Sequence, residues 1–386
     1  MKFLHLSDLH LGKRVYGYSM LDDQRVILEQ MIQLAKQQQV DAVLIAGDIY
    51  DKTVPPSEAV RLFDWFFTVL CREQITVLAI SGNHDSGDRL NFGRTLLAQQ
   101  GMHLAGTYDN ILETVTLCDE DGCQVQFHLL PWLRPMELRD TLQLEQSSQQ
   151  CAIQAVFKQA DWAEQARHVL LAHTFVTVGG ELPAQSDSEI VPVGGVDAVD
   201  AALFDRYDYV ALGHIHRPQR LGRECVRYAG SPLKYSFSEA RYAKSVPLVT
   251  IHTEGEVEID LLPLKPQHDL REIRGKLKDV IADTTIQAGD PTDYIRVILT
   301  DEEELYDPQG ALKAVYPNLM RLDFDNSRTR ASDTEGMTQE DTVQQLTIAE
   351  LFAQFFAEQN GKDMTAWQTD RLMELCRRME ESNEAD

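Results

Sequence analysis

The 386-residue sequence lacks several features that would assign it to a well-defined class of protein. No apolar run approaches the ~18 residues that a membrane-spanning helix needs. The six cysteines are scattered without a repeating spacing, which argues against a disulfide framework. No secretory leader precedes the first apolar run, which starts within three residues of Met1. These absences predict a reduced, cytoplasmic protein.

The sequence also lacks an excess of positive charge, since its formal net charge is −25. A strongly acidic chain is an unfavourable general binder of nucleic acid. The charge is uneven, however, because residues 331–386 alone hold 13 acidic and 4 basic side chains. The net charge of the whole chain therefore says little about any one face of it.

The order of apolar patterns along the first half predicts an α/β fold. Apolar runs typical of buried strands alternate with helical patterns over 22–39 and 57–73, which favours a parallel sheet covered by helices. From about residue 110, hairpin patterns appear, with a further helix expected over 148–166. Parallel and antiparallel strands together predict two sheets packed face to face, with helices outside.

A change of composition after "PLKPQHD" predicts further parts of the chain. Residues 1–265 would form the main domain, and 266–325 a small α/β domain. In that small domain the pattern predicts a helix over 270–282, a strand over 294–300, a helix over 308–316 and a strand over 319–325. Residues 326–345 show no apolar periodicity and are typical of a linker. Residues 346–382 predict a pair of amphipathic helices.

Five buried runs end in polar side chains of the kind that bind metals. The residues that follow these runs are Asp8, His10, Asp48, Asn83, His84, Asp85, His173, His214 and His216. Ligands bind at the carboxyl edge of open α/β sheets, and residues two apart on an extended segment share a face. One such residue alone is more often a helix cap or a structural histidine. Five such ends together indicate a shared cation, because buried and unpaired carboxylates and imidazoles are very costly.

The types of these residues indicate which metals they would hold. Carboxylate, amide and imidazole ligands without a thiolate suit Mn²⁺, Fe or Zn²⁺ better than a soft metal. Seven candidate ligands are too many for one ion. Two ions with a bridging carboxylate fit the set, and Asp48 is the natural bridge.

In order and type, these residues resemble the signature of the calcineurin-like metallophosphoesterases. The stretches "SDLHLG", "GDIYD", "SGNHDS" and "GHIHRPQ", with the small domain and the tail, resemble the nuclease subunits of bacterial SbcCD-type complexes. The resemblance implies a four-layer α/β/β/α sandwich with a small α/β capping, DNA-binding domain and a C-terminal helical pair. It further implies two Mn²⁺ ions per subunit, DNA as substrate, an SbcC-type ATPase as partner and a homodimer inside a heterotetramer acting at the nucleoid.

The resemblance also implies roles for individual residues. One ion would take Asp8, His10 and His216, the other Asn83, His173 and His214, and Asp48 would bridge them. His84 would lie near the scissile phosphate as a catalytic residue together with Asp48. Asp85 could orient His84 or cap the next turn. Archaeal and eukaryotic relatives have a second active-site histidine after the Gly-Asp motif, where this sequence has Asp51 and Lys52.

Local positive charge would have to hold DNA despite the acidic total. Lys13, Arg14, Arg89 and Arg217 lie directly beside metal motifs, which favours contacts with phosphates. Ordinary solvated charge is the alternative for each of them. Further basic candidates near these motifs or in a later loop are Arg94, Arg220, Lys234, Arg241 and Lys244.

The tail pattern predicts a surface for a partner. In "TIAELFAQFFAEQNGK", Thr347 and Glu350 form a capping box, and apolar residues follow at helical spacing. The predicted partner-binding residues are Leu351, Phe352, Phe355, Phe356 and Leu372, which would dock on the SbcC-type ATPase. The alternative is that this pair of helices folds back on its own enzyme domain.

Three functions compete at this point. The leading hypothesis is a Mn²⁺-dependent 3′–5′ double-strand exonuclease and single-strand or hairpin endonuclease in DNA repair, recombination and replication, as the resemblance implies. A phosphatase or cyclic-nucleotide phosphodiesterase would use the same motifs, but it would not need the extra domain and tail. An inactive scaffold is disfavoured by the complete set of ligands.

Overall fold

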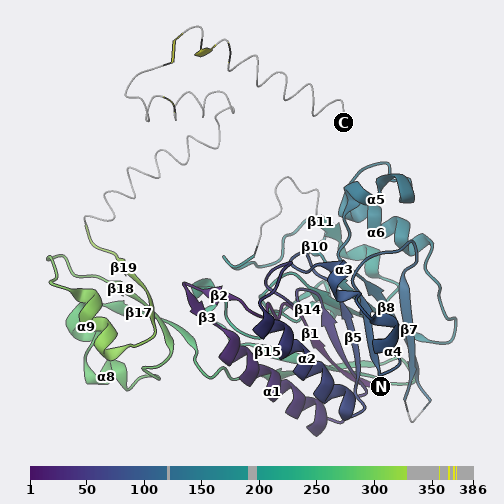
Figure 1. The fold of residues 1–386 in the computed structure, drawn as a ribbon, viewed down its shortest axis with the longest axis horizontal. Helices are drawn as coiled ribbons and strands as arrows, with labels where there is room; N and C mark the ends of the chain where they lie inside the picture. Colours follow the sequence, from purple (N-terminus) through teal and green to yellow (C-terminus); the bar gives the residue numbers. More distant parts are fainter. Residues whose placement is uncertain are drawn as a thin grey trace. The chain divides into compact units, whose positions relative to one another are not determined.

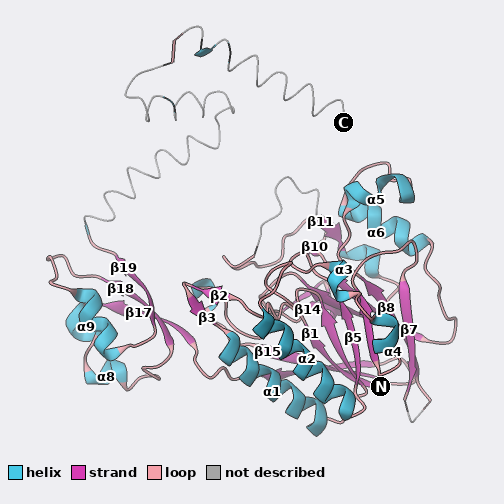
Figure 2. Cartoon of the chain, in the orientation of Figure 1, coloured by secondary structure: helices cyan, strands magenta, loops and turns pink. Residues whose placement is uncertain are grey.

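The computed structural model describes residues 1–119, 122–189 and 198–327, together with Phe356, 364–365, 368–369 and Arg371. Two six-stranded mixed sheets are the largest sheets in this part of the chain (Figures 1 and 2). Their strand orders are β16-β15-β1-β4-β5-β6 and β13-β14-β12-β9-β8-β7.

The first sheet is parallel at its centre and antiparallel at one side. Strands β1, β4, β5 and β6 run parallel to their neighbours, whereas β15 pairs antiparallel with β1 and with β16. Short apolar runs with buried residues on both faces suit such central strands. The strands are β1 Lys2–Leu6, β4 Ala42–Ala46, β5 Thr76–Ile80, β6 Met102–Ala105, β15 Ser245–Ile251 and β16 Val257–Pro263.

The second sheet also has a parallel centre, but it has an antiparallel strand at each edge. Strands β8, β9, β12 and β14 are parallel neighbours, and β7 and β13 pair antiparallel with β8 and β14. The strands are β7 Glu113–Cys118, β8 Gln124–Leu130, β9 Arg167–His173, β12 Tyr209–Gly213, β13 Gln219–Leu221 and β14 Arg223–Tyr228.

Three apolar clusters separate four layers, which confirms the predicted α/β sandwich. Phe3, Phe127 and Tyr209 are fully buried together in the cluster formed by residues of both sheets. A second cluster joins the first sheet to α1 and α2, which lie side by side in Figure 1, and a third joins the second sheet to α6. The helices of these regions are α1 Leu21–Gln37, α2 Ser57–Arg72, α3 Gly87–Leu90, α4 Arg94–Ala98, α5 Pro135–Leu142 and α6 Gln149–Lys158.

One predicted helix is shorter than its pattern indicates. The expected helix over 148–166 ends at Lys158. The chain then turns, because tertiary contacts compete with the helical pattern: the Ala163 backbone N–H donates to Gln126, and Trp162 packs against the ring of His128 and under the Arg206 guanidinium.

The region after residue 266 forms a three-stranded sheet in the order β17-β18-β19. The predicted helix over 270–282 is wrong, since Leu270–Gly275 is strand β17 and only the short helix α7 Leu277–Val280 follows. Exposed Glu272 and Arg274 alternate with less exposed neighbours, which is the period of a strand, and Gly275 disfavours a helix. The remaining elements are α8 Asp283–Ile286, β18 Tyr294–Leu299, α9 Pro308–Val315 and β19 Leu319–Phe324, of which β18, α9 and β19 confirm the predicted order.

The chain divides into two units. One comprises Met1–Ile273, Ile281–Val297 and Gln309–Leu322, and the other comprises Arg274–Val280, Ile298–Pro308 and the described residues from Asp323 onward. The boundaries expected from the sequence, 1–265, 266–325, 326–345 and 346–382, stay a prediction. The smaller elements of the first unit are β2 Arg14–Val15, β3 Tyr18–Ser19, β10 Phe175–Thr177, β11 Ala198–Asp200, η1 Ala201–Phe204 and η2 Phe237–Glu239.

Some predictions fall where the structure describes no conformation. The predicted tail helices over 346–382 lie outside the described residues except for a few positions, so Leu351, Phe352, Phe355 and Leu372 are not placed, and Phe356 is. Within the described ranges, no helix is long and apolar enough to cross a membrane.

Candidate metal centre

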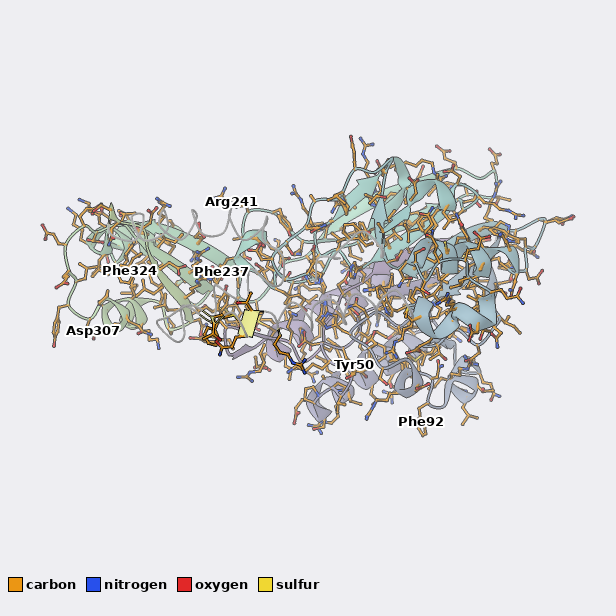
Figure 3. The ribbon with its side chains drawn as sticks, turned by 90° about the horizontal axis from the view of Figure 1, so that it is seen from above. Tyr50, Phe92, Phe237, Arg241, Asp307 and Phe324 are labelled. Carbon is orange, nitrogen blue, oxygen red and sulfur yellow. The ribbon has the colours of Figure 1, made fainter. Side chains whose placement is uncertain are left out.

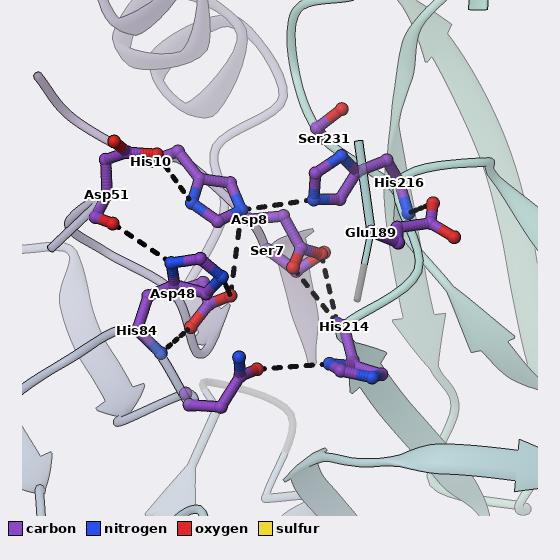
Figure 4. Close-up of polar contacts among 12 residues, drawn as sticks. Ser7, Asp8, His10, Asp48, Asp51, His84, Glu189, His214, His216 and Ser231 are labelled. Atoms are coloured by element: carbon purple, nitrogen blue, oxygen red, sulfur yellow. Dashed lines mark hydrogen bonds and ion pairs between the residues drawn. The ribbon is translucent and has the colours of Figure 1, made fainter. Parts of the chain in front are cut away.

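The carboxyl ends of five strands from both sheets meet at one place. Strands β1, β4 and β5 end there in the first sheet, and β9 and β12 in the second. The structure brings together all seven residues expected to bind metal, and it buries all of them except Asn83, which is half-buried. Figure 4 shows most of these side chains pointing toward one another. The seven are Asp8, His10, Asp48, Asn83, His173, His214 and His216.

Four of these residues have left-handed backbone. The φ angles are 53° at Asp8, 44° at His10, 51° at Asp48 and 108° at His214. Such conformations cost about 1–3 kcal/mol each in a residue with a side chain, and they gather at functional sites. Hydrogen bonds hold them: the Asp8 N–H donates to Gly47 O at 3.1 Å, and the His10 N–H to Asp48 O at 3.0 Å. The turns after β1, β4 and β12 thus present ligands at a cost that packing offsets.

The first group of donors surrounds His10. Its Nε2 lies 3.1 Å from Nε2 of His216 and 3.6 Å from Oδ2 of Asp48. One ligand atom each from Asp8, His10 and His216 lies within 4.8 Å of the others. The buried Nδ1 of His10 has no hydrogen-bond partner among the described residues. Two imidazole nitrogens and two carboxylates this close together are the donor set of a cation.

The second group surrounds His173. Its Nδ1 lies 2.8 Å from the carbonyl of Ala46, so Nδ1 carries a proton, and Nε2 offers a lone pair to a cation once the ring loses its second proton. That lone pair faces Asn83 Oδ1 at 3.1 Å and Asp48 Oδ2 at 3.4 Å. The Nδ1 of His214 lies 3.1 Å from the same amide oxygen. Converging acceptors repel one another unless a cation lies between them.

The donor chemistry therefore fits two metal ions. Three overlapping groups meet the distance requirement of a metal site: Asp8 with His10 and His216, His10 with Asp48 and His84, and Asp8 with Asp48 and His173. Asp48 belongs to two of these groups, as a bridging carboxylate would. All ligand atoms are nitrogen or oxygen, which suits hard and borderline divalent cations. The division of the ligands between the two ions stays a prediction.

Electrostatics at the site favour an ionised bridge. Burial alone would raise the pKa of Asp48, but the imidazoles of His173, His10 and His84 hold that pKa well below its usual range. Burial likewise opposes the charged form of His173, yet Asp48 beside it raises the pKa of His173 to about 9. Burial and the neighbouring His173 lower the pKa of His214 to about 3. The centre holds its negative charge on Asp48.

His84 differs from the surrounding histidines in its exposure. Its side chain is 27% exposed, compared with 1% for His10 and 0% for His173. The backbone N–H of His84 donates to Asp48 Oδ1 at 2.9 Å, and the ring Nδ1 of His84 lies 3.0 Å from the carbonyl oxygen of Asp51. His84 is therefore anchored at the centre while part of its ring stays accessible to a substrate.

Asp85 does not contact the ring of His84 in the described structure. Its carboxylate accepts the backbone N–H groups of Ile49, Tyr50 and Gly82 at 2.9–3.1 Å. Burial and the nearby charge of Asp48 raise the pKa of Asp85 to about 7, against the effect of these three donors. Asp85 therefore joins the loop after β4 to the loop after β5. This contact differs from both expected roles, which were orienting the ring of His84 and capping the next turn.

A buried polar network behind His216 was missed by sequence reasoning. The Oγ of Ser188 lies 2.6 Å from Nδ1 of His216 and 2.8 Å from Oε1 of Glu239, which is 0% exposed. Lys244 pairs with Glu239 at 2.5 Å and donates to the carbonyl of His216 at 2.8 Å. No local pattern marks these residues, because their partners come from distant parts of the chain.

The basic residues expected to contact DNA lie in different environments. The Nζ of Lys13 is 2.8 Å from Asp51 Oδ1, while Arg14, Arg89 and Arg217 are exposed. Arg241 is exposed on the loop after η2 (Figure 3). Contact of these residues with DNA stays a prediction. Lys244 is a correction: it is buried and ion-paired, so it is not available to a phosphate.

Comparison with known proteins assigns the family. Residues 1–218, more than half of the chain, match the family model described as calcineurin-like phosphoesterase. The chain belongs to the calcineurin-like phosphoesterases. Residues 266–360 of this phosphoesterase match a second model, SbcD_C, described as the type 5 capsule protein repressor C-terminal domain. Membership of this family, together with the clusters of His and Asp side chains, identifies the protein as a metal-dependent phosphoesterase.

Solved structures of similar fold include two with low sequence identity to this phosphoesterase. A dimetal phosphatase from Danio rerio is 14% identical, with a TM-score of 0.40, over 68% of this chain and 95% of that one. The protein TT1561 of Thermus thermophilus is 13% identical, with a TM-score of 0.35, over 67% of this chain and 98% of that one.

Proposed function

We propose that this phosphoesterase is the DNA nuclease subunit of an SbcCD-type complex. It would cut DNA as a 3′–5′ double-strand exonuclease and as an endonuclease on single strands and hairpins, in repair, recombination and replication. The observation that carries the proposal is the combination, on one chain, of His and Asp clusters that fit two metal ions with a C-terminal region that matches SbcD_C.

The centre would hold two Mn²⁺ ions through Asp8, His10, Asp48, Asn83, His173, His214 and His216. When bound, the ions would supply Lewis-acid activation of the phosphodiester and of the attacking water. The all-nitrogen and oxygen donor set is consistent with Mn²⁺.

The residues of this chain contribute orientation and proton transfer. Asp48 holds the His84 backbone N–H, which fixes the loop after β5 against the loop after β4. The accessible ring of His84 would donate a proton to the leaving oxygen as the bond to phosphorus breaks. In the stretch after the Gly-Asp motif, where relatives have a second histidine, this chain has Asp51 and Lys52, and the Asp51 carboxylate is paired with Lys13. A second histidine acid is therefore not part of the proposal.

The acidic chain would bind DNA through local charge and through a partner. Arg14, Arg89 and Arg217 are exposed near the metal motifs and could meet backbone phosphates. An SbcC-type ATPase would supply further affinity by binding the tail around Phe352 and Phe355, within a heterotetramer built on a homodimer of this chain.

One assay tests the proposed function. Cleavage of a hairpin DNA is measured with Mn²⁺, next to hydrolysis of a chromogenic phosphodiester and of a phosphomonoester, with and without the ATPase. We expect Mn²⁺-dependent cleavage of the hairpin, which the ATPase and ATP increase. Hydrolysis of the small esters without any cleavage of DNA would instead identify a phosphatase or cyclic-nucleotide phosphodiesterase.

A further inference from the structure

A cavity of about 320 Å³ adjoins the metal centre. Its lining includes Gly82 and Asp85, which flank the Asn83–His84 pair of the centre, and Trp132, which contacts His214. The volume lies within the ~300–1,000 Å³ that is typical of small-ligand sites. The chemistry proposed above does not use this cavity.

Trp132 is a fixed aromatic side chain on the cavity wall. Its indole stacks on the imidazole of His214 at 5.8 Å and 29°, and meets His173 edge-on at 6.1 Å. Its backbone N–H donates to Ser81 O at 3.1 Å. The residue is half-buried, so part of it remains accessible. Because the ring is already ordered, a planar ligand would bind to it at little cost in side-chain entropy.

Uncharged polar groups line another part of the cavity. Ser86 and Thr107 both belong to the lining. Their hydroxyls suit a ligand that has hydrogen-bond donors and acceptors along its edge.

The charges of the lining decide between classes of ligand. The lining residues include three with a carboxylate, Asp85, Asp88 and Glu137, and one with a guanidinium, Arg134. Arg134 itself pairs with Glu137 at 3.2 Å. A second phosphate group would meet more negative than positive charge here. A neutral ring with donor and acceptor edges fits the lining better.

We infer that this cavity is a subsite for the nucleoside next to the scissile phosphate. The base of that nucleoside, unstacked from its strand, would lie against Trp132 with its polar edge toward Ser86 and Thr107. The inference rests on the proposed nuclease function and names the part of the DNA that the centre recognises. Single nucleosides bound in this way suit an enzyme that acts at strand ends and in hairpin loops, where bases unstack readily.

The test compares two Mn²⁺-dependent substrates of the full chain that share a p-nitrophenolate leaving group. Thymidine 5′-(p-nitrophenyl phosphate) has a nucleoside, whereas methyl p-nitrophenyl phosphate has only a methyl group in its place. We expect Trp132→Leu to lower the ratio of the two kcat/KM values roughly 5- to 100-fold, the range of base–aromatic stacking.

A matched variant outside the cavity controls for the loss of an aromatic ring. Trp162→Leu removes an indole that packs against Arg206 and should not change the ratio. Calorimetric titration of thymidine 5′-monophosphate gives a readout that is independent of turnover.

Two outcomes would overturn the inference. The first is that Trp132→Leu lowers kcat/KM equally for both substrates, as it would if Trp132 only supported His214. The second is that thymidine 5′-monophosphate binds wild type and Trp132→Leu equally well. A failed nuclease proposal looks different: the preference for the thymidine ester would persist and depend on Trp132, while DNA would not be cleaved.

Discussion

Among single residues, Asp48 links the histidines of the metal centre. Its carboxylate lies within 4.0 Å of ring nitrogens of His10, His84 and His173. We expect Asp48→Ala to abolish phosphodiester hydrolysis and to release at least one metal ion, because a bridge serves both cations. Metal counting on the purified variant tests this, with exposed Asp140→Ala as the matched control. Two ions bound at wild-type affinity would contradict the assignment of the bridge.

His84 is expected to act on the substrate rather than on the metal ions. We expect His84→Ala to keep both ions and to lower turnover by about 10²–10⁴-fold, the usual contribution of general acid catalysis. The measurement is the rate of DNA cleavage at saturating Mn²⁺, together with the metal content. A wild-type rate in this variant would show that the role at the leaving group is wrong.

Ser188 links a metal ligand to a buried carboxylate. It accepts the Nδ1 proton of His216 and donates to Glu239, which leaves Nε2 of His216 free for a cation. We expect Ser188→Ala to weaken Mn²⁺ binding about 10- to 100-fold, the usual effect of removing such a support. This variant leaves the buried pair of Glu239 and Lys244 intact, so the fold should survive.

Calorimetric titration of Mn²⁺ measures the effect of the serine. Ser57→Ala, at the exposed start of α2, is the control for the loss of a hydroxyl. If Ser188→Ala binds Mn²⁺ with wild-type affinity, the hydroxyl of Ser188 does not support metal binding through His216.

At the scale of secondary-structure elements, a buried histidine on β8 makes stability depend on pH. Burial, reinforced by the charges of His168 and Arg206, lowers the pKa of His128 to about 3. The unfolded chain therefore binds more protons at this residue between about pH 3 and 6.5. The uncharged, buried His128 therefore stabilises the fold fully only above about pH 6.5. As the pH falls to 5, the free energy of unfolding decreases by about 2 kcal/mol because of this residue.

We expect His128→Leu to reduce that dependence on pH. The free energy of unfolding, measured with urea at about pH 7.5 and pH 5, should fall less in the variant than in wild type. Exposed His252→Leu is the matched control, because its histidine side chain is 45% exposed. Identical losses in wild type and His128→Leu would show that other groups cause the acid sensitivity.

The elements also show where local pattern is sufficient and where it fails. The strands with apolar runs, such as β1, β4 and β12, were predictable because buried parallel strands are short and continuously apolar. The sequence pattern predicts a helix where strand β17 lies, because Leu, Arg, Glu and Lys are good helix formers and the alternation of the strand covers only a few residues. Pairing with β18 supplies the hydrogen bonds that decide its conformation.

For the whole molecule, the tail is expected to bind the partner. The described strands end with β19 at Phe324, and the sequence from about 346 predicts apolar helical faces. We expect a chain that ends near Phe324 to stay folded and keep Mn²⁺-dependent nuclease activity, yet to fail to co-purify with the SbcC-type ATPase. Co-purification and circular dichroism of the truncated chain measure this.

Either of two results would remove the docking role of the tail. The truncated chain could bind the ATPase with undiminished affinity, which would place the docking surface elsewhere. It could also lose its fold, which would make the tail part of the enzyme.

The sequence by itself determined the sandwich class and the residue types of the candidate centre. Those features are local: each ligand follows its own apolar run, and the spacing of Asp8 and His10 needs no knowledge of other strands. The same holds for the family signature, because its motifs are short and contiguous.

Only the tertiary structure decided how those ligands meet and what supports them. His10 and His216 are 206 residues apart in the chain, yet their Nε2 atoms are 3.1 Å apart. Ser188, Glu239 and Trp132 gain their roles from residues on other strands and loops, with no motif of their own. Burial gives Glu239 and Lys244 their strong interaction, because a charge removed from water must find a partner, and folding alone brings that partner near.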